Sequence, residues 1–289
     1  MTENQPKESS ERITLVKLLQ DFGDREVENT NEKVSTIFPW WKKAVTEYGI
    51  QARIEDLHEI KDSLNELVRE NGNCCKYPVH EAAMLGAVKL IEFMLSNSYD
   101  LNTKDHFGRT PWIALTCGRG KTETASLFIQ SSKDFGIELN AQDIYGNTAW
   151  HYACRDGTTE IAKLIIQLSK DFGIDLNVKD NIGSSGLHLA CFYGRTETVQ
   201  TIMESSKDFD INLNVKNNMG RTPFHEACFR GKTETVQIMI KNWKEFCVDI
   251  KALDNEGKTA LDLINHCEGQ RFNLIREMLV KEYSQIDVT

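Results

Sequence analysis

The sequence lacks long apolar runs. None of its segments approaches the roughly 18–20 consecutive apolar residues that a membrane-spanning helix needs. The first ten residues, MTENQPKESS, are polar and include two glutamates, so they lack the apolar segment of a secretory signal. We therefore expect residues 1–10 to form a disordered start, and we expect no membrane insertion.

Positive charge is in deficit. The 289 residues include 34 lysines and arginines against 43 aspartates and glutamates, which gives a formal net charge of −9. Because an acidic chain repels phosphate backbones, we expect no nucleic-acid partner. The chain is nevertheless long enough for one large domain, or two small ones, with a buried core.

Clustered cysteines are also missing. Eight cysteines are present, but none forms a Cys-x-x-Cys pair of the kind that zinc sites use. Three of them follow His-x-Ala at intervals of 37 residues, namely Cys154, Cys191 and Cys228. They mark one recurring position, where a free cysteine acts as a small hydrophobe. The pattern predicts reduced, buried thiols, no metal site, and a cytoplasmic or nuclear location.

Catalytic motifs are absent as well. Three Gly-Lys-Thr triplets resemble the end of a phosphate-binding loop, but that motif requires a glycine five residues before its second glycine. The residues at those positions are Leu115, Glu226 and Ala252. No Gly-x-Ser-x-Gly, His-Glu-x-x-His or Asp-x-Asp-x-Asp-Gly pattern occurs. We therefore predict that the chain is not an enzyme and has no cofactor. Residues 1–73 are too few for us to expect enzymatic activity there.

The dominant feature present is an internal repeat. Related stretches such as YGNTAWHYAC and MGRTPFHEAC recur along most of the chain. Successive units are spaced by 33, 38, 37, 37 and 37 residues, measured at one shared position. That position is occupied by Tyr77, Thr110, Thr148, Ser185, Thr222 and Thr259.

The parts of each unit predict a turn followed by two helices. A glycine after two tip residues, such as Gly108, fits a tight turn with positive φ. The threonine or serine two residues later can cap a first helix, with Pro111 or Pro223 at its first position. After a second glycine, another helix begins at Thr159, Thr196 and Thr233. The apolar residues of this second helix have helical spacing. In the third unit they are Ile161, Leu164, Ile165, Leu168 and Phe172.

The segment TPFHEACFRGKTETVQIMI, residues 222–240, resembles the ankyrin repeat, whose hallmark is Thr-Pro-Leu-His-x-Ala in a unit of about 33 residues. The resemblance covers about six units over residues 74–285, within a repeat domain that we expect to span residues 74–289. It implies an all-α solenoid of paired antiparallel helices with β-hairpin tips, and protein binding rather than catalysis. It also implies a structural role for the recurring histidine, which hydrogen-bonds within its turn and to the next unit. This position holds His80, His151, His188 and His225.

The units depart from that family pattern in several places. Most exceed it by four residues, about one helical turn, within segments such as SSKDFGI. We therefore expect a longer second helix, whose apolar face is kept by Phe135, Phe172, Phe209 and Phe246. The second unit has an extra residue in TPWIALTC, which predicts a distorted first helix. The last unit has Asp262 in the histidine position and an inserted HCEGQRF, which suits a capping repeat.

Residues 11–73 precede the repeats and allow two interpretations. Helical spacing around Ile13 and Leu57 predicts two helices, with Pro39 interrupting the segment between them. These helices could form a cap that covers the open end of the solenoid. Alternatively, they could form a separate docking module built around Trp40 and Trp41.

The resemblance to ankyrin repeats implies that a partner binds on the tips and on the exposed side of the first helices, which together line a concave face. The residue before each turn glycine is apolar, where the family commonly has a polar residue: Phe107, Tyr145, Ile182 and Met219. The concave side of the first helices adds Tyr152, Phe192, Tyr193, Phe229 and Arg230. Aligned apolar, aromatic and arginine side chains are typical of interfaces. We predict a monomeric scaffold or inhibitor that binds an unidentified protein, unless the tips pack on each other only to stiffen the row.

A second hypothesis makes the repeats a substrate. Three asparagines lie in Leu-Asn segments similar to those that an asparaginyl hydroxylase modifies in ankyrin repeats: Asn140, Asn177 and Asn214. That pattern also has a leucine eight residues upstream, where this chain has Ser132, Ser169 and Ser206. The competing interpretation is that these asparagines brace the hairpins.

Overall fold

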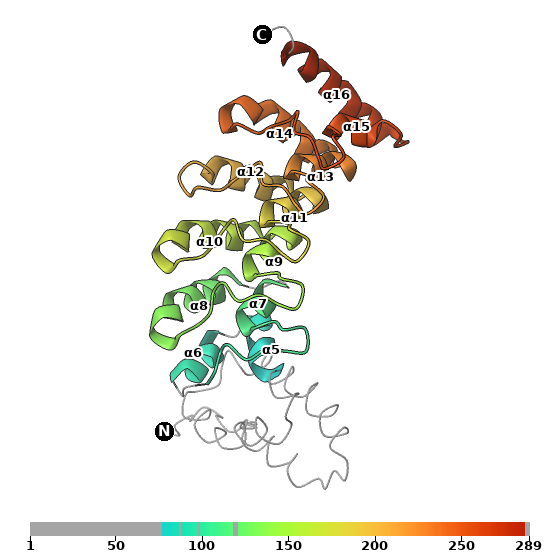
Figure 1. Ribbon diagram of the computed structural model, residues 1–289. Coiled ribbons are helices and arrows are strands. Elements are labelled where there is room, and N and C mark those ends of the chain that lie inside the picture. Colours follow the sequence, from blue (N-terminus) through green and yellow to red (C-terminus); the bar gives the residue numbers. More distant parts are fainter. Residues whose placement is uncertain (1–76, 87, 97–98, 118–120, 287–289) are drawn as a thin grey trace, which may run out of the picture.

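The computed structural model describes residues 77–86, 88–96, 99–117 and 121–286, and these form a stack of antiparallel helix pairs (Figure 1). The expected disordered start over 1–10 and the expected cap or docking segment over 11–73, with Trp40 and Trp41, lie outside the described residues. Within the described part the chain is all-α, as the repeat predicts. The tips differ from the expected β-hairpins, because they are tight turns and no strand occurs among the described residues.

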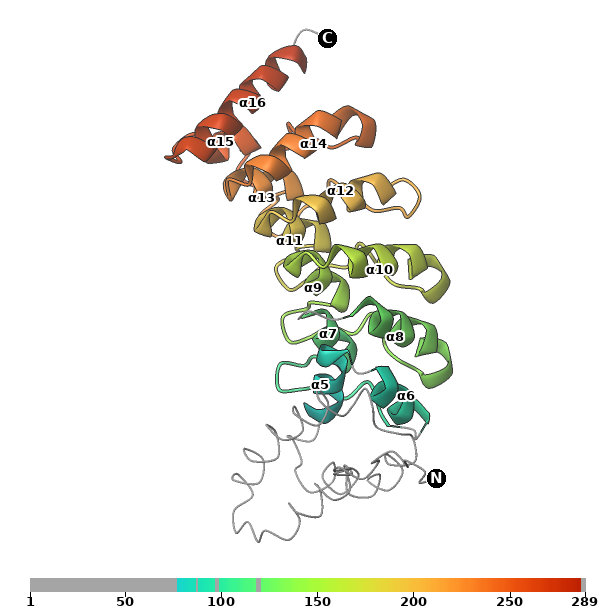
Figure 2. The same ribbon diagram turned by 180° about the vertical axis from the view of Figure 1, so that it is seen from behind.

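Each unit contributes one helix to each of two columns (Figures 1 and 2). The first helices form one column, from which the turns project: α5 (Tyr77–Leu85), α7 (Pro111–Thr116), α9 (Ala149–Asp156), α11 (Gly186–Tyr193), α13 (Pro223–Phe229) and α15 (Ala260–Ile264). The second helices form the other column: α6 (Val88–Ser96), α8 (Thr122–Phe135), α10 (Thr159–Phe172), α12 (Thr196–Ser205), α14 (Thr233–Phe246) and α16 (Gln270–Ile286).

The helix boundaries follow local capping signals. Thr148 has an extended backbone, and its side chain accepts a hydrogen bond from the His151 amide at the start of α9. Gly157 ends α9 in the left-handed conformation, which a residue without Cβ adopts at little cost. The other predicted caps occupy the same position before their helices: Thr110, Ser185, Thr222 and Thr259. The three threonines predicted to begin second helices also do so.

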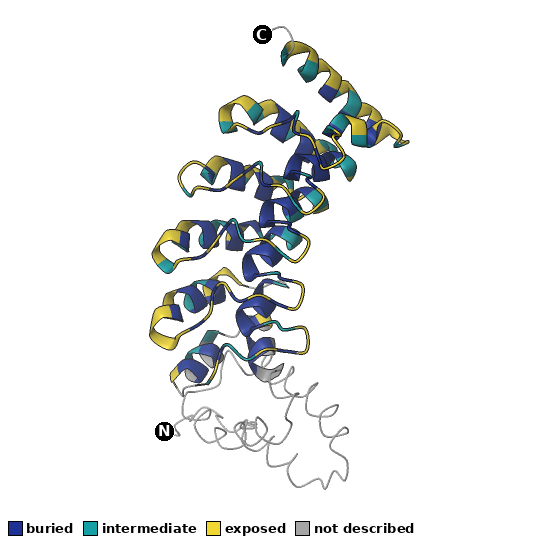
Figure 3. Cartoon of the chain, in the orientation of Figure 1, coloured by how far each residue is buried: buried dark blue, intermediate teal, exposed yellow. Residues whose placement is uncertain are grey.

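The core lies between successive units, where the first and second helices face one another (Figure 3). The recurring cysteine of the first helix is fully buried in three successive units, as predicted: Cys154, Cys191 and Cys228. Trp150 is also buried, and its indole donates to the carbonyl of Leu176 at 3.0 Å. Gly186 of the next unit leaves room for this ring, because a Cβ there would lie 2.6 Å from the indole nitrogen.

The four additional residues lengthen the second helices in three of the four units concerned. Helices α8, α10 and α14 each run for 14 residues, whereas α12 ends after 10 at Ser205. The segment after α12 consists of turns in the same place, and Ile211 N–H still closes it on Ser206 O at 3.0 Å. The expected longer helix is therefore wrong for α12.

The phenylalanines of the additional turn do not all form the expected apolar face. Phe172, Phe209 and Phe246 are half-buried against the core, but Phe135 is exposed. Each of the three half-buried rings lies beneath a lysine of the preceding unit, at 4.8–5.6 Å from ammonium to ring centroid. Phe135 differs because the unit before it lacks this additional turn.

The first helix of the second unit, for which the sequence predicts a distortion, is short and lacks the usual helix ending. Helix α7 has six residues and ends at Cys117 without a left-handed cap. The last unit also differs from the others. Asp262 replaces the histidine in its capping box with Thr259, and α16 is the longest helix in the described part of the chain.

Candidate partner-binding surface

Each tip is held by the acidic or amide residue at its base. In the third unit, Asp143 Oδ1 accepts hydrogen bonds from the amides of Tyr145 and Asn147, both at 2.9 Å. Side chains of this type bond readily to backbone amides nearby, which is why they favour turns. The same two contacts recur at the other described tips, at Asp105, Asp180, Asn217 and Asp254.

Neighbouring tips are joined to one another through their backbones. The amides of Asn181, Asn218 and Asn255 each donate to the carbonyl of the preceding tip, at 3.0–3.1 Å. The side-chain amides of the same three asparagines also donate to a carbonyl of the preceding tip, at 3.0–3.2 Å. This spacing requires the turn glycines, because a Cβ on Gly220 would lie 2.5 Å from Asn255 N.

The apolar tip side chains remain exposed. We call Phe107, Ile144, Tyr145, Ile182 and Met219 the tip row. Their side chains are between 37 and 65 % exposed, which agrees with the exposure predicted for four of them. Ile144 was missed from the sequence; the signal was available, because the first tip residue is polar at the neighbouring tips. Backbone hydrogen bonds join the tips in addition to any packing between these side chains.

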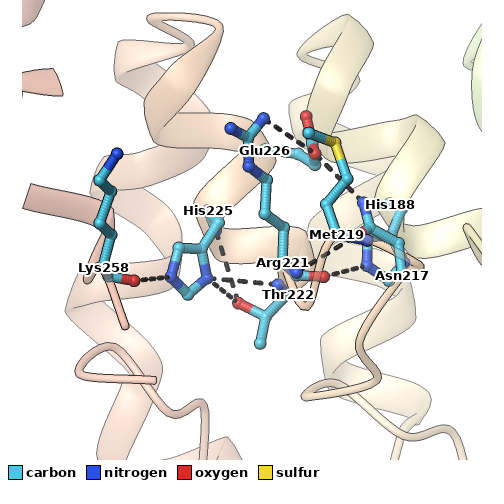
Figure 4. Close-up of polar contacts among 8 residues, drawn as sticks. All are labelled: His188, Asn217, Met219, Arg221, Thr222, His225, Glu226 and Lys258. Carbon is cyan, nitrogen blue, oxygen red and sulfur yellow. Dashed lines mark hydrogen bonds and ion pairs between the residues drawn. The ribbon is translucent and has the colours of Figure 1, made fainter. Parts of the chain in front are cut away.

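The recurring histidine connects each first helix to the next tip (Figure 4). His225 Nδ1 accepts from the Thr222 amide at 3.2 Å, and Nε2 lies 3.3 Å from Lys258 O. His151 and His188 repeat this arrangement one and two units earlier. Since Nδ1 is an acceptor, Nε2 carries the proton and the ring is neutral. Burial lowers the pKa of His188 to about 4, so these histidines have the predicted structural role.

One residue of the predicted concave surface is not accessible. Tyr152 is only 7 % exposed, because its hydroxyl turns back to Asp143 at 2.6 Å and the Arg155 guanidinium covers its ring. The expectation that Tyr152 faces a partner is therefore wrong. Tyr193 and Arg230 are exposed, and Phe192 and Phe229 are half-buried beside them. These four residues come from α11, α13 and the end of α13, so they lie together on the column of first helices.

The asparagines of the substrate hypothesis bridge successive units. Asn177 Nδ2 donates to Asp210 O at 2.8 Å, and its Oδ1 accepts from the Asn212 amide at 2.8 Å. Asn140 and Asn214 make the corresponding pairs of contacts with their own next units. Both polar atoms of each side chain are thus used, as the bracing interpretation expects. Modification by a hydroxylase stays an alternative hypothesis.

Neither a metal site nor a membrane span is found in the part of the chain that the structure describes. No three His, Cys, Asp or Glu side chains are grouped there so that they could hold a metal ion. None of the described helices is both long enough and apolar enough to cross a bilayer.

Comparison with known proteins agrees with this architecture. A family model described as ankyrin repeats (three copies) matches residues 79–180, 135–214 and 187–289. The chain belongs to the ankyrin-repeat family. Among solved structures, an ankyrin repeat domain from Acinetobacter baumannii AYE is similar in fold, with a TM-score of 0.58 at 24 % identity over 72 % of this chain and 98 % of that one. No curated protein sequence matches the chain.

Membership of the ankyrin-repeat family bears on function in general terms. Ankyrin repeats are generally protein-interaction modules. In this ankyrin-repeat chain, the tip row lies on the turns that project from the column of first helices (Figure 1). Exposed Tyr193 ends α11 in that column, and exposed Arg230 directly follows α13. That side is the candidate partner-binding surface.

Proposed function

We propose that this chain is a non-catalytic scaffold or inhibitor that binds a protein partner through its tip row and the adjacent first helices. The observation that carries the proposal is the tip row itself. Large apolar side chains stand exposed on four consecutive turns, whose backbones are fixed by hydrogen bonds to their neighbours. Contiguous exposed apolar patches usually mark interaction sites.

The geometry of the tips favours recognition by side chains. The tip amides and carbonyls already bond to one another and to the residue at the base of each turn. An extended segment of the partner therefore finds few free backbone groups with which to add a strand. A fixed row also loses little conformational freedom when the partner binds, which favours affinity.

Comparative capture with two variants tests the proposal. The tip variant replaces Phe107, Tyr145, Ile182 and Met219 by serine. A control variant replaces three exposed apolar residues elsewhere by serine, namely Phe135, Leu274 and Val280. Quantitative mass spectrometry of proteins captured from a lysate should show binders shared by the wild type and the control variant but reduced at least tenfold with the tip variant. Equal capture by all three chains would refute the tip row as the partner site.

The same comparison separates binding from folding. Hot-spot truncations cost about 2 kcal/mol or more each in binding, whereas substitutions at exposed positions rarely change stability by more than about 0.5 kcal/mol. We therefore expect the thermal midpoints of the tip variant and the wild type to be close. A large fall in the midpoint with unchanged capture would instead assign the row to stiffening the tips.

A further inference from the structure

The Arg230 guanidinium lies over an aromatic ring of the preceding unit. Its guanidinium carbon is 3.9 Å from the centroid of Phe192 and 5.3 Å from that of Phe229. Phe192 in turn contacts Tyr193, with ring centroids 4.9 Å apart. A guanidinium stacked on an aromatic face in this way is attracted to the ring and keeps the N–H groups at its edges available as donors.

The donors of Arg230 have no acceptor among the described residues. The side chain is exposed, and no carboxylate or carbonyl in the described ranges pairs with it. Two other arginines on the same column show the contrast: Arg109 pairs with Asp105, and Arg155 with Asp156, both at 2.7 Å. Arg230 is thus an exposed cation, stacked on Phe192, without an ion-pair partner among the described residues.

A second arginine on the same ring is also incompletely satisfied. The Arg221 guanidinium lies 4.5 Å from the Phe229 centroid, and its Nε is buried without a hydrogen-bond partner. Its nearest carboxylate, that of Glu226, is 3.9 Å from Nη1, too far for a hydrogen bond (Figure 4). Two guanidinium groups therefore lie within 5.3 Å of the Phe229 ring centroid, and both retain donors without a hydrogen bond.

Further cations lie at the junctions between first and second helices. The side-chain stems of Arg195 and Lys232 lie over Gly157 and Gly194, the glycines that end α9 and α11. The acidic residues Glu197 and Glu234 stand near the starts of α12 and α14. In the described part of the chain, neither glutamate forms an ion pair with Arg195, Lys232 or Arg230.

We propose that the surface formed by Phe192, Tyr193 and Arg230 binds an acidic peptide segment of the partner, with an aspartate or glutamate on the Arg230 guanidinium. This inference rests on the proposed function and adds the chemistry of the partner. A carboxylate matches the planar donor edge of arginine in bidentate geometry. The ring of Phe192 holds that edge in place before binding, and exposed Tyr193 offers an apolar contact for a neighbouring side chain.

A peptide suits this surface better than a nucleic acid. The chain carries a formal net charge of −9, which disfavours a continuous phosphate backbone. A peptide with one or two acidic residues places charge only where Arg230 meets it. Nucleic acid binding is therefore an outcome that the test must be able to detect.

Selection of peptides on the full chain tests the inference. Random twelve-residue peptides displayed on phage are selected, and the most enriched one is synthesised with and without its acidic residues changed to the corresponding amides. We expect the enriched pool to share an aspartate or glutamate. The acidic peptide should bind R230Q at least tenfold more weakly than the wild type, whereas its amide counterpart should bind both chains equally. The matched control K163Q, which removes an exposed cation on α10, should bind the acidic peptide like the wild type.

Two more variants separate stacking from charge. In F192L the apolar contact is kept but the ring that positions Arg230 is lost, so the acidic peptide should bind severalfold more weakly. R230K keeps the charge without the planar fork, and it should retain only part of the affinity. Near-ultraviolet and far-ultraviolet circular dichroism of each variant checks that the solenoid is intact.

Several results would overturn the inference. These are a neutral or basic consensus, no enrichment at all, equal binding of the acidic peptide to the wild type and R230Q, or binding of a twelve-residue oligodeoxythymidine that R230Q abolishes. If R230Q has no effect while the tip variant still loses captured proteins, only the acidic-peptide inference fails. If the tip variant captures proteins normally while R230Q loses the acidic peptide, the tip row is refuted as a partner site, and the Arg230 surface is supported as the site for the acidic peptide.

Discussion

The Nε2 atom of His188 lies 2.9 Å from the main-chain oxygen of Arg221, across the boundary between two repeat units. At its other side, Nδ1 accepts from the amide of Ser185 at 3.1 Å. One neutral imidazole therefore caps its own helix and fixes the start of the next unit. Protonation would place a second N–H against the donor of Ser185, in a site where burial already disfavours charge.

Acid should therefore weaken the solenoid over a defined pH range. The pKa of His188 is about 4 in the folded chain against 6.5 unfolded, so between these values the unfolded chain binds more protons. The stabilisation is complete above about pH 6.5 and is lost as the pH falls towards 4, by about 3 kcal/mol for this residue at ~1.4 kcal/mol per pH unit. Burial lowers the pKa of His151 and His225 as well, so they add to the loss.

Urea unfolding at pH 7 and pH 4 measures this effect. The variant H188Q serves as the control, because glutamine can keep the capping box but does not titrate. We expect the difference in unfolding free energy between the two pH values to be about 3 kcal/mol smaller in H188Q than in the wild type. An identical pH dependence in both chains would show that His188 is not the titrating group.

The turn glycines provide a matched pair for the contact between tips. Gly220 and Gly257 have φ values of +74° and +72°, but only Gly220 has a following tip against it. G257A should cost about 1–2 kcal/mol, the left-handed strain of a residue with Cβ. G220A should cost clearly more, because its Cβ would also press on Asn255 N at 2.5 Å. Thermal or urea unfolding of the two variants measures the difference. Equal losses of stability would mean that the neighbouring tip shifts to accommodate the Cβ at no cost in free energy.

Burial should protect three of the thiols. Burial raises the pKa of Cys154, Cys191 and Cys228 above that of an ordinary thiol, so little reactive thiolate forms. Exposed Cys247 should react rapidly with a thiol reagent in the native chain. Peptide mass mapping after brief labelling should find these three unmodified, and denatured chain without reductant should label all eight cysteines. A native disulfide at any of the three would contradict this assignment.

Much of the fold could be predicted because its signals are local. A capping threonine, a turn glycine and a proline at the first helical position act within a few residues, so they place the start of α9 or α13 from the sequence alone. The spacing of the repeat then determines which elements lie side by side. Cys191 was recognised as a core position for the same reason.

The parts that could not be predicted depend on which contact a side chain selects. Tyr152 was placed on the partner surface from its position on the helix, yet its hydroxyl bonds to Asp143 nine residues earlier and withdraws the ring. The stacking of Arg230 on Phe192 depends equally on the rotation between two units. Phe135 is exposed because of what the preceding unit lacks, which its own repeat does not reveal.

The bridging asparagines should resist hydroxylation in the folded chain. Asn177 uses Nδ2 on Asp210 O and Oδ1 on the Asn212 amide, so an enzyme can reach its Cβ in an extended segment only after these bonds between units open. Each such bond contributes about 0.5–1.5 kcal/mol, and the same bridge recurs at Asn140 and Asn214. Co-expression with an asparaginyl hydroxylase should therefore leave the intact mass unchanged.

An unchanged mass could have two reasons: protection by the fold, or a sequence that the enzyme does not recognise. A synthetic peptide covering residues 167–187, which cannot form the bridge, separates them. Modification of the peptide alone would show that the fold protects the asparagine, and modification of neither would show that the sequence, with Ser169 in the leucine position, is not recognised. A gain of about 16 Da in the folded chain, mapped to any of the three asparagines, would show that the hydrogen bonds between units do not prevent modification. That result would favour the substrate hypothesis.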